Sequence, residues 1–157
     1  MNTDRNVVPA NPVGSVPSPR DLSRQECLTA LGGQTLGRIA VSQAALPLIL
    51  PVNYALEGAN IVFRTRAGSL LERTCRDTIV AFEIDQYDET AAFGWSVLVV
   101  GVANVVSAGD WLRAAELGLE STGASDGGIF VKIVPGSITG RTVGDGQLPA
   151  PVDGHGR

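Results

Sequence analysis

Histidine and cysteine are scarce in this sequence, and their scarcity excludes several kinds of active site. The only histidine, His155, lies in the C-terminal segment PVDGHGR, so we expect neither a multi-histidine metal site nor a histidine-dependent triad within one chain. The two cysteines, Cys27 and Cys75, are far apart and outside any CxxC arrangement. Two cysteines can form one disulfide, but the sequence favours reduced, buried and inert thiols.

Long apolar stretches and basic runs are missing as well. The apolar stretches ALPLILPV and VLVVGVANVV are far shorter than a membrane span, and the first residues lack the basic-then-apolar pattern of a signal peptide. The net charge is −4, and the 12 basic residues are scattered along the chain. We therefore expect a cytoplasmic protein that binds neither a membrane nor nucleic acid.

The sequence does contain enough apolar residues, 44% of 157, to form the core of one domain. Residues 1–19 hold four of the nine prolines and have almost no apolar periodicity, which is typical of a disordered arm. Residues 143–157 have a similar composition and are predicted to be a disordered tail. The folded domain is therefore expected to span residues 20–142.

A change of periodicity along the chain predicts a mainly β protein. Ser23 and Glu26 have the spacing of a capping box, so a short helix is expected to begin there and to end at Gly32 and Gly33. Helical segments are also predicted at 67–77 and 110–120. The extended segments are 36–43, 46–58, 60–66, 78–85, 94–107 and 129–141.

Short connections between the first three extended segments favour antiparallel hairpins. Pro47 and Pro51 cannot donate to a ladder, so the segment 46–58 is expected at a sheet edge or at a bulge. The segment 94–107 is apolar on both faces, which predicts that a partner or ligand covers one of them. Six antiparallel strands with two to three short helices indicate a small β-barrel, because an open sheet would leave apolar edges.

The stretch FRTRAGSLL, residues 63–71, delivers Arg64, Thr65 and Arg66 to a glycine-containing loop that opens a helix. Amide groups of such a loop and of the first helical turn lack intrahelical partners, so the stretch can bind an anion. It can equally be an ordinary connection. On periodicity alone Arg64 belongs to a solvated strand face, and Ser69 is most simply a helix N-cap.

Six segments, in this order, resemble the pyridoxamine 5′-phosphate oxidase-like family of FMN-binding split barrels, in particular its nitroimidazole-resistance-like branch. They are GRIAVS (37–42), LPVNY (50–54), FRTRAGSLL (63–71), VAFEID (80–85), GWSVLVVGVA (94–103) and ITGR (138–141). The resemblance covers about residues 21–142. It implies a six-stranded antiparallel split β-barrel that forms a homodimer, with FMN bound at each of two sites between the subunits.

The resemblance also implies roles for particular residues. The phosphate-binding pattern of the family is matched by Arg64, Thr65, Gly68, Ser69 and Leu71. Leu70 departs from it, because many relatives have a lysine there, and Arg66 or Arg73 can replace the missing cation. The family further places Asn53, Trp95, Ser96 and Arg141 near the cofactor. Without the family, Asn53 reads as a local hydrogen-bonding residue, Trp95 as a core aromatic and Arg141 as a surface charge.

These expectations favour an FMN-dependent oxidoreductase that acts on an unknown small molecule. The flavin ring would carry the redox chemistry, which agrees with the lack of an evident acid–base set. Glu83 and Asp85 lie two apart on one strand and read as a solvated face without a catalytic role. The alternative is a non-catalytic module that binds a flavin, F420 or haem, and the missing lysine favours it.

Overall fold

The computed structural model describes residues 19–107, 111–119, 128–144 and 148. The predicted arm at 1–19 and tail at 143–157 lie almost entirely outside these residues, as does His155, so those predictions stay untested. No helix among the described residues has the length and apolar character needed to cross a membrane.

The described residues form three helices, α1 (Arg24–Gly32), α2 (Leu70–Thr74) and α3 (Trp111–Glu116). The predicted capping box of α1 is confirmed, because the Glu26 amide donates to Ser23 Oγ at 3.3 Å and the Ser23 amide donates to Glu26 Oε2 at 2.8 Å. Helix α2 is shorter than the predicted 67–77, since residues 67–69 form the turn and N-cap before it.

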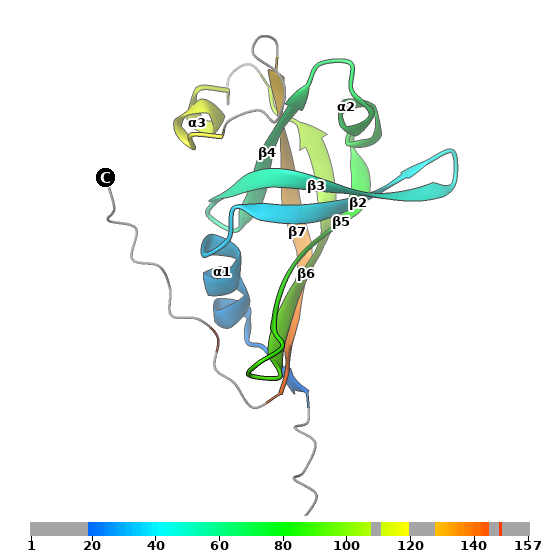
Figure 1. The fold of residues 1–157 in the computed structure, drawn as a ribbon. Coiled ribbons are helices and arrows are strands. Elements are labelled where there is room, and N and C mark those ends of the chain that lie inside the picture. The colour runs from blue at the N-terminus through cyan, green and yellow to red at the C-terminus, as the bar shows by residue number, and fades with distance from the viewer. Residues whose placement is uncertain (1–18, 108–110, 120–127, 145–147, 149–157) are drawn as a thin grey trace, which may run out of the picture.

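The strands form one antiparallel sheet that closes into a barrel, which confirms the predicted mainly β split-barrel fold (Figure 1). They are β1 (Arg20–Asp21), β2 (Leu36–Gln43), β3 (Leu46–Glu57), β4 (Asn60–Arg66), β5 (Thr78–Asp88), β6 (Phe93–Val105) and β7 (Gly128–Val143). Their order is β1-β7-β4-β3-β2-β5-β6, and a further pairing between β6 and β7 closes the ring. The prediction of six strands missed β1, whose two residues are too few to show a period.

Strand β3 is an edge strand where its prolines lie, which is one of the two predicted alternatives. Residues 46–53 pair with β2, whereas residues 54–57 pair with β4, so the first part of β3 has one described neighbour. The Tyr54 amide donates to Thr35 O at 2.9 Å, which places even-numbered amides of β3 on the β2 side. Pro47 and Pro51 therefore occupy positions whose missing N–H would face the free side. The parting of β3 from β4 leaves an opening beside the start of α2.

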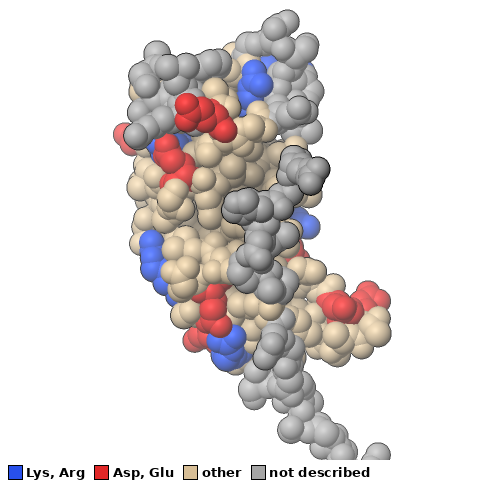
Figure 2. All heavy atoms as spheres, turned by 90° about the vertical axis from the view of Figure 1, so that its left-hand side faces the viewer, with Lys and Arg blue, Asp and Glu red and all other residues tan. Residues whose placement is uncertain are grey.

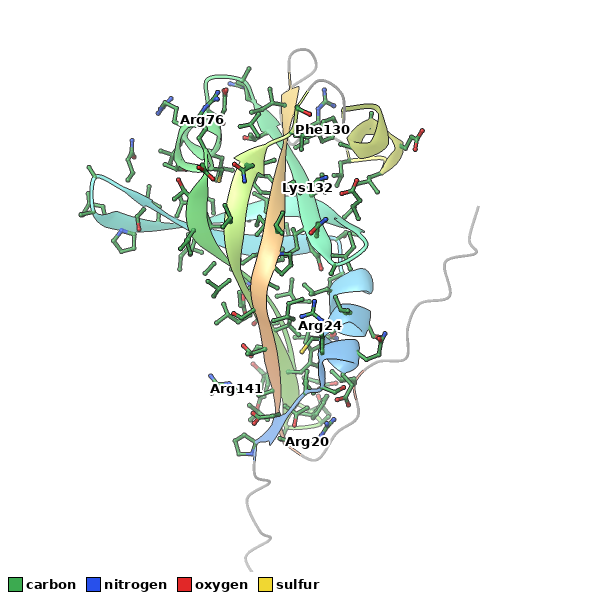
Figure 3. All side chains as sticks on the ribbon, turned by 180° about the vertical axis from the view of Figure 1, so that it is seen from behind. Arg20, Arg24, Arg76, Phe130, Lys132 and Arg141 are labelled. Atoms are coloured by element: carbon green, nitrogen blue, oxygen red, sulfur yellow. The ribbon has the colours of Figure 1, made fainter. Side chains whose placement is uncertain are left out.

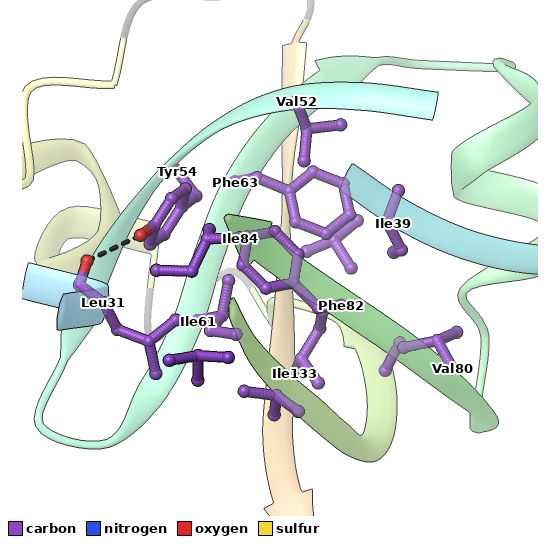
Figure 4. Close-up of a cluster of buried hydrophobic side chains, with 14 of the residues drawn as sticks. Leu31, Ile39, Val52, Tyr54, Ile61, Phe63, Val80, Phe82, Ile84 and Ile133 are labelled. Atoms are coloured by element: carbon purple, nitrogen blue, oxygen red, sulfur yellow. Dashed lines mark hydrogen bonds between the residues drawn. The ribbon is translucent and has the colours of Figure 1, made fainter. Parts of the chain in front are cut away.

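The barrel interior is filled by large side chains from all parts of the sheet (Figure 4). Tyr54 meets Phe82 edge-on, with ring centroids 4.8 Å apart, and its hydroxyl donates to Leu31 O at 2.6 Å. This bond joins the end of α1 to the barrel, and burial raises the pKa of Tyr54. Gly37 lies under Phe82, where a Cβ would come within 2.2 Å of the ring.

A smaller apolar cluster lies on the outside of the barrel, where α3 covers β4 and β7. Val62, Ala114 and Phe130 are buried there, together with the half-buried Val106 and Leu117. Figure 2 shows the side of the molecule that carries α1 and α3, on which acidic and basic side chains are interspersed. The outer face of β4 is therefore not a simple solvated surface.

Candidate functional site

The connection between β4 and α2 forms a hollow with a volume of about 420 Å³, here called the corner hollow. It is lined by Pro51, Val52, Arg64, Thr65, Arg66, Ala67, Gly68, Ser69 and Leu71. Arg64 and Thr65 lie near the end of β4. A tight turn follows the strand, and Ser69 caps α2 after it. Gly68 has a φ of +74°, a conformation that side-chain-bearing residues rarely adopt, so the turn requires a glycine.

Two hydroxyl groups lie side by side in the corner hollow. Thr65 Oγ1 and Ser69 Oγ are 3.0 Å apart, and Ser69 Oγ also accepts the Glu72 amide at 3.2 Å. One of the two hydroxyl hydrogens forms the hydrogen bond between Thr65 and Ser69, so the other hydroxyl hydrogen is free to be donated to a ligand. Ser69 is thus an N-cap, as its simplest reading predicts, and can still take part in binding.

Positive charge gathers around this corner although the protein is acidic overall. Residues 61–77 contain four arginines and two acidic residues, against a net charge of −4 for the chain. Arg73 Nη1 donates to Gly68 O at 2.6 Å, which brings its guanidinium to the rim of the turn. Arg76 pairs with Glu72. The Gly68 amide donates to Glu72 Oε2 at 2.5 Å, and this bond, followed by the arginine neighbours, lowers the pKa of Glu72.

Arg64 is half-buried and does not lie on a solvated face. Its Nε is buried and has no hydrogen-bond partner within the described structure. The guanidinium lies over the ring of Phe130, with Cζ 5.8 Å from the ring centroid. An unpaired buried donor is costly, so the packing around this side chain must hold it in place. Arg64 also lines the corner hollow.

A second hollow of about 340 Å³ lies on the outer face of β6 and β7 and contains Ser96 and Arg141. It is also lined by Asp21, Leu98, Thr139 and Gly140. Ser96 and Arg141 are direct cross-strand neighbours. Figure 3 shows Arg76 beside α2 at one end of the molecule and Arg141 projecting outward near the other end.

The structure therefore separates the predicted site residues within one chain. One cross-strand row, Pro51–Arg38–Glu83–Leu98–Thr139, runs from the corner hollow to the second hollow. Four interstrand spacings correspond to about 19 Å along the sheet. Trp95 is 3% exposed and packs in the core, as its simplest reading predicts, and Asn53 is exposed on β3 and lines neither hollow. Their predicted contacts with a cofactor stay predictions.

Sequence reasoning missed the partner of the carboxylates on β5. Arg38 Nη1 lies 2.6 Å from Asp85 and 3.5 Å from Glu83, in the middle of the row between the hollows. Burial is the largest cause that raises the pKa of Glu83, and the neighbouring Asp85 adds to it. The pairing was invisible because Arg38 and Glu83 are 45 residues apart in the sequence. Gly128 and Phe130 were missed for the same reason, since β7 pairs with β4 only in the folded chain.

Comparisons with known proteins agree with this architecture. The sequence model of the pyridoxamine 5′-phosphate oxidase family matches residues 23–142. An uncharacterized protein of Mycobacterium tuberculosis is 31% identical over 135 residues, which are 82% of this chain and 89% of that protein.

Solved structures are also similar over most of the chain. The FAD binding protein from Mycobacterium smegmatis is 31% identical with a TM-score of 0.66, over 78% of this chain and 97% of that one. A putative pyridoxamine 5′-phosphate oxidase from Corynebacterium glutamicum is 30% identical with a TM-score of 0.68, over 82% and 96% of the two chains. With the family model spanning the barrel from α1 to the end of β7, this protein belongs to the pyridoxamine 5′-phosphate oxidase family of split-barrel proteins.

Proposed function

We propose that this protein is an FMN-dependent oxidoreductase that binds the flavin phosphate in the corner hollow. The observation that carries the proposal is the corner hollow itself, which Arg64 lines together with the paired hydroxyls of Thr65 and Ser69. A phosphate accepts hydrogen bonds from such donors and gains from the surrounding positive charge. The similarity to a FAD binding protein at 31% identity supports a flavin as the ligand.

Each polar residue at the corner has a proposed role in binding the phosphate end of a flavin. Arg64 supplies a fixed donor, and the hydroxyl pair supplies one more hydrogen. Leu70 brings no charge where many relatives have a lysine. We assign that role to Arg73, because its guanidinium is held at the turn by Gly68 O. When bound, the flavin ring supplies the redox chemistry, while the chain binds and orients it.

We further propose that the protein works as a homodimer. The outer face of β5, β6 and β7 carries a row of opposed apolar residues, Ile79, Val102 and Val134, which are 72%, 37% and 50% exposed. Leu98, 41% exposed, continues this face toward the second hollow. Contiguous apolar surface of this kind is typical of protein interfaces. A second copy on this face would cover the apolar side of strand 94–107 that sequence analysis expected to be covered.

The visible spectrum of the purified protein, with and without added FMN, tests the proposed function. We expect a yellow protein whose flavin absorbance bleaches on addition of NADH or NADPH and returns with an acceptor. A yellow protein that never cycles favours the alternative, a non-catalytic flavin, F420 or haem module, which the leucine at position 70 supports. A protein that takes up no FMN contradicts the proposal, and the same titration with FAD distinguishes mononucleotide from dinucleotide binding.

Substitution of Arg64 tests the binding site itself. We predict that Arg64→Ala lowers FMN affinity at least tenfold, because the substitution removes a charge-assisted hydrogen bond worth about 1.5–3 kcal/mol. The fold should persist, since the side chain is only half-buried. Fluorescence titration of FMN gives the affinity, and a thermal melt without ligand checks the fold. Unchanged affinity would return Arg64 to a structural role.

A further inference from the structure

The side chain of Arg64 is held from outside the corner hollow by two residues of β7. Arg64 and Phe130 are direct cross-strand partners, and the guanidinium lies over the Phe130 ring at 5.8 Å. A Cβ built on Gly128 would lie 2.4 Å from Arg64 Nε and 3.1 Å from Nη2. The guanidinium therefore occupies space that the side chain of any other residue at position 128 would fill.

Phe130 is itself fixed by packing. It is 3% exposed and lies in the outer cluster with Val62, which is fully buried, and with Ala114 of α3. Val62 and Arg64 are two residues apart on β4, so they share the outer face of that strand. The ring thus has little freedom to move, and it presents a face on which a cation is stabilised.

We propose that Gly128 and Phe130 are positioning residues that hold the Arg64 guanidinium beside the corner hollow, where it binds the anionic group of the ligand. The Nε lies buried without a partner, which an arginine free to turn toward solvent would avoid. The inference rests on the proposed function, because it takes the ligand to be the phosphate of a flavin. The residues that position Arg64 thus lie on β7, outside the loop that is proposed to bind the phosphate.

The first test is Gly128→Ala, measured by FMN titration. The added Cβ meets the end of a flexible side chain, so Arg64 should move away while the barrel stays folded. We expect FMN affinity to fall at least tenfold in Gly128→Ala and severalfold in Phe130→Leu. Gly32→Ala is the matched control, because its Cβ would have its nearest contact at 3.9 Å, and its affinity should equal that of the wild type.

A double-mutant cycle separates positioning of Arg64 from general damage. In an Arg64→Ala background, Gly128→Ala should change FMN affinity less than twofold. A full tenfold loss in that background, or no loss in the wild-type background, would overturn the proposal. Each variant is used only if circular dichroism shows that it retains the helix and strand content of the wild type.

The second test needs no flavin and so remains decisive if the protein binds none. The Arg64 Nε–H signal in a nitrogen-15 spectrum, identified by its loss in Arg64→Ala, should exchange with solvent at least tenfold more slowly than those of the exposed Arg73 and Arg76. Gly128→Ala should abolish this protection. A wild-type Arg64 signal that exchanges as fast as those of the exposed arginines would contradict the positioning of Arg64 by Gly128 and Phe130. Protection that is unchanged in Gly128→Ala would contradict it as well. Absence of FMN binding with these exchange results intact would instead reject the proposed function.

Discussion

Single residues in this protein often serve both the barrel and its candidate site. Ser69 caps α2 and shares a hydrogen bond with Thr65 in the corner hollow. Arg64 belongs to a β-strand, and yet one of its nitrogens is buried without a partner. The sequence identified these residue types, but only cross-strand pairing shows that Phe130 and Gly128 lie against Arg64.

The Tyr54 hydroxyl gives a prediction at this scale. Tyr54→Phe leaves the buried Leu31 carbonyl without its 2.6 Å bond, so the free energy of unfolding should fall by about 1–2 kcal/mol. Urea denaturation measures this change. The matched control is Tyr87→Phe, because Tyr87 is 59% exposed and its variant should retain wild-type stability. Equal stability of the two variants would show that the bond to α1 contributes nothing.

At the scale of elements, the hairpin of β2 and β3 has an unusual turn. Gln43 pairs with Leu46, so Ala44 and Ala45 form a two-residue loop, with φ values of 49° and 66°. Such a turn favours Asn-Gly, and alanine is strained there. The turn is therefore held by the two long strands that it joins.

Replacing this turn should stabilise the protein. The double substitution Ala44→Asn with Ala45→Gly relieves left-handed strain of about 1 kcal/mol, part of which is offset by the greater entropy of glycine in the unfolded chain. A small rise in melting temperature is expected by calorimetry. Ala45→Val should lower it, because a β-branched residue fits this conformation poorly. A stabilising valine would contradict the proposed strain.

The start of α1 predicts a response to acid. The side-chain bond from Arg20 is the largest cause that lowers the pKa of Glu26, from 4.5 to about 2, and bonds from Ser23 add to it. Because the folded pKa is depressed, this stabilisation is present above pH 4.5 and is lost as pH falls toward 2. Glu26→Gln should therefore lose less stability than the wild type between these pH values, as measured by urea denaturation. An identical pH profile would contradict the contribution of this carboxylate.

At the scale of the whole molecule, the outer face of β5, β6 and β7 predicts the oligomeric state. We expect the mass of a dimer by light scattering, and Ile79→Lys should shift it toward the monomer, because a charge would be buried at the interface. Leu46→Lys is the control, since Leu46 is also exposed but lies on β3, outside this face. A wild-type protein that stays monomeric would reject the homodimer.

The sequence by itself determined the period of the strands, the capping box of α1 and the glycine turn of the corner, and it limited the prolines to a sheet edge or a bulge. All of these depend on residues close together in the chain, whose spacing directly limits the local backbone. It also indicated which residue types can bind an anion, because the arginines, Thr65 and Ser69 lie within one short segment.

Only the tertiary structure decided which distant residues meet. The sheet placed Arg38 against the β5 carboxylates through the pairing of β2 with β5, and it put Gly128 and Phe130 beside Arg64 through the pairing of β4 with β7. It also set Ser96 and Arg141 apart from the corner hollow, although all belong to one family pattern. The physical reason is that strand register is fixed by packing of the whole barrel, and a sequence read locally contains no measure of that register.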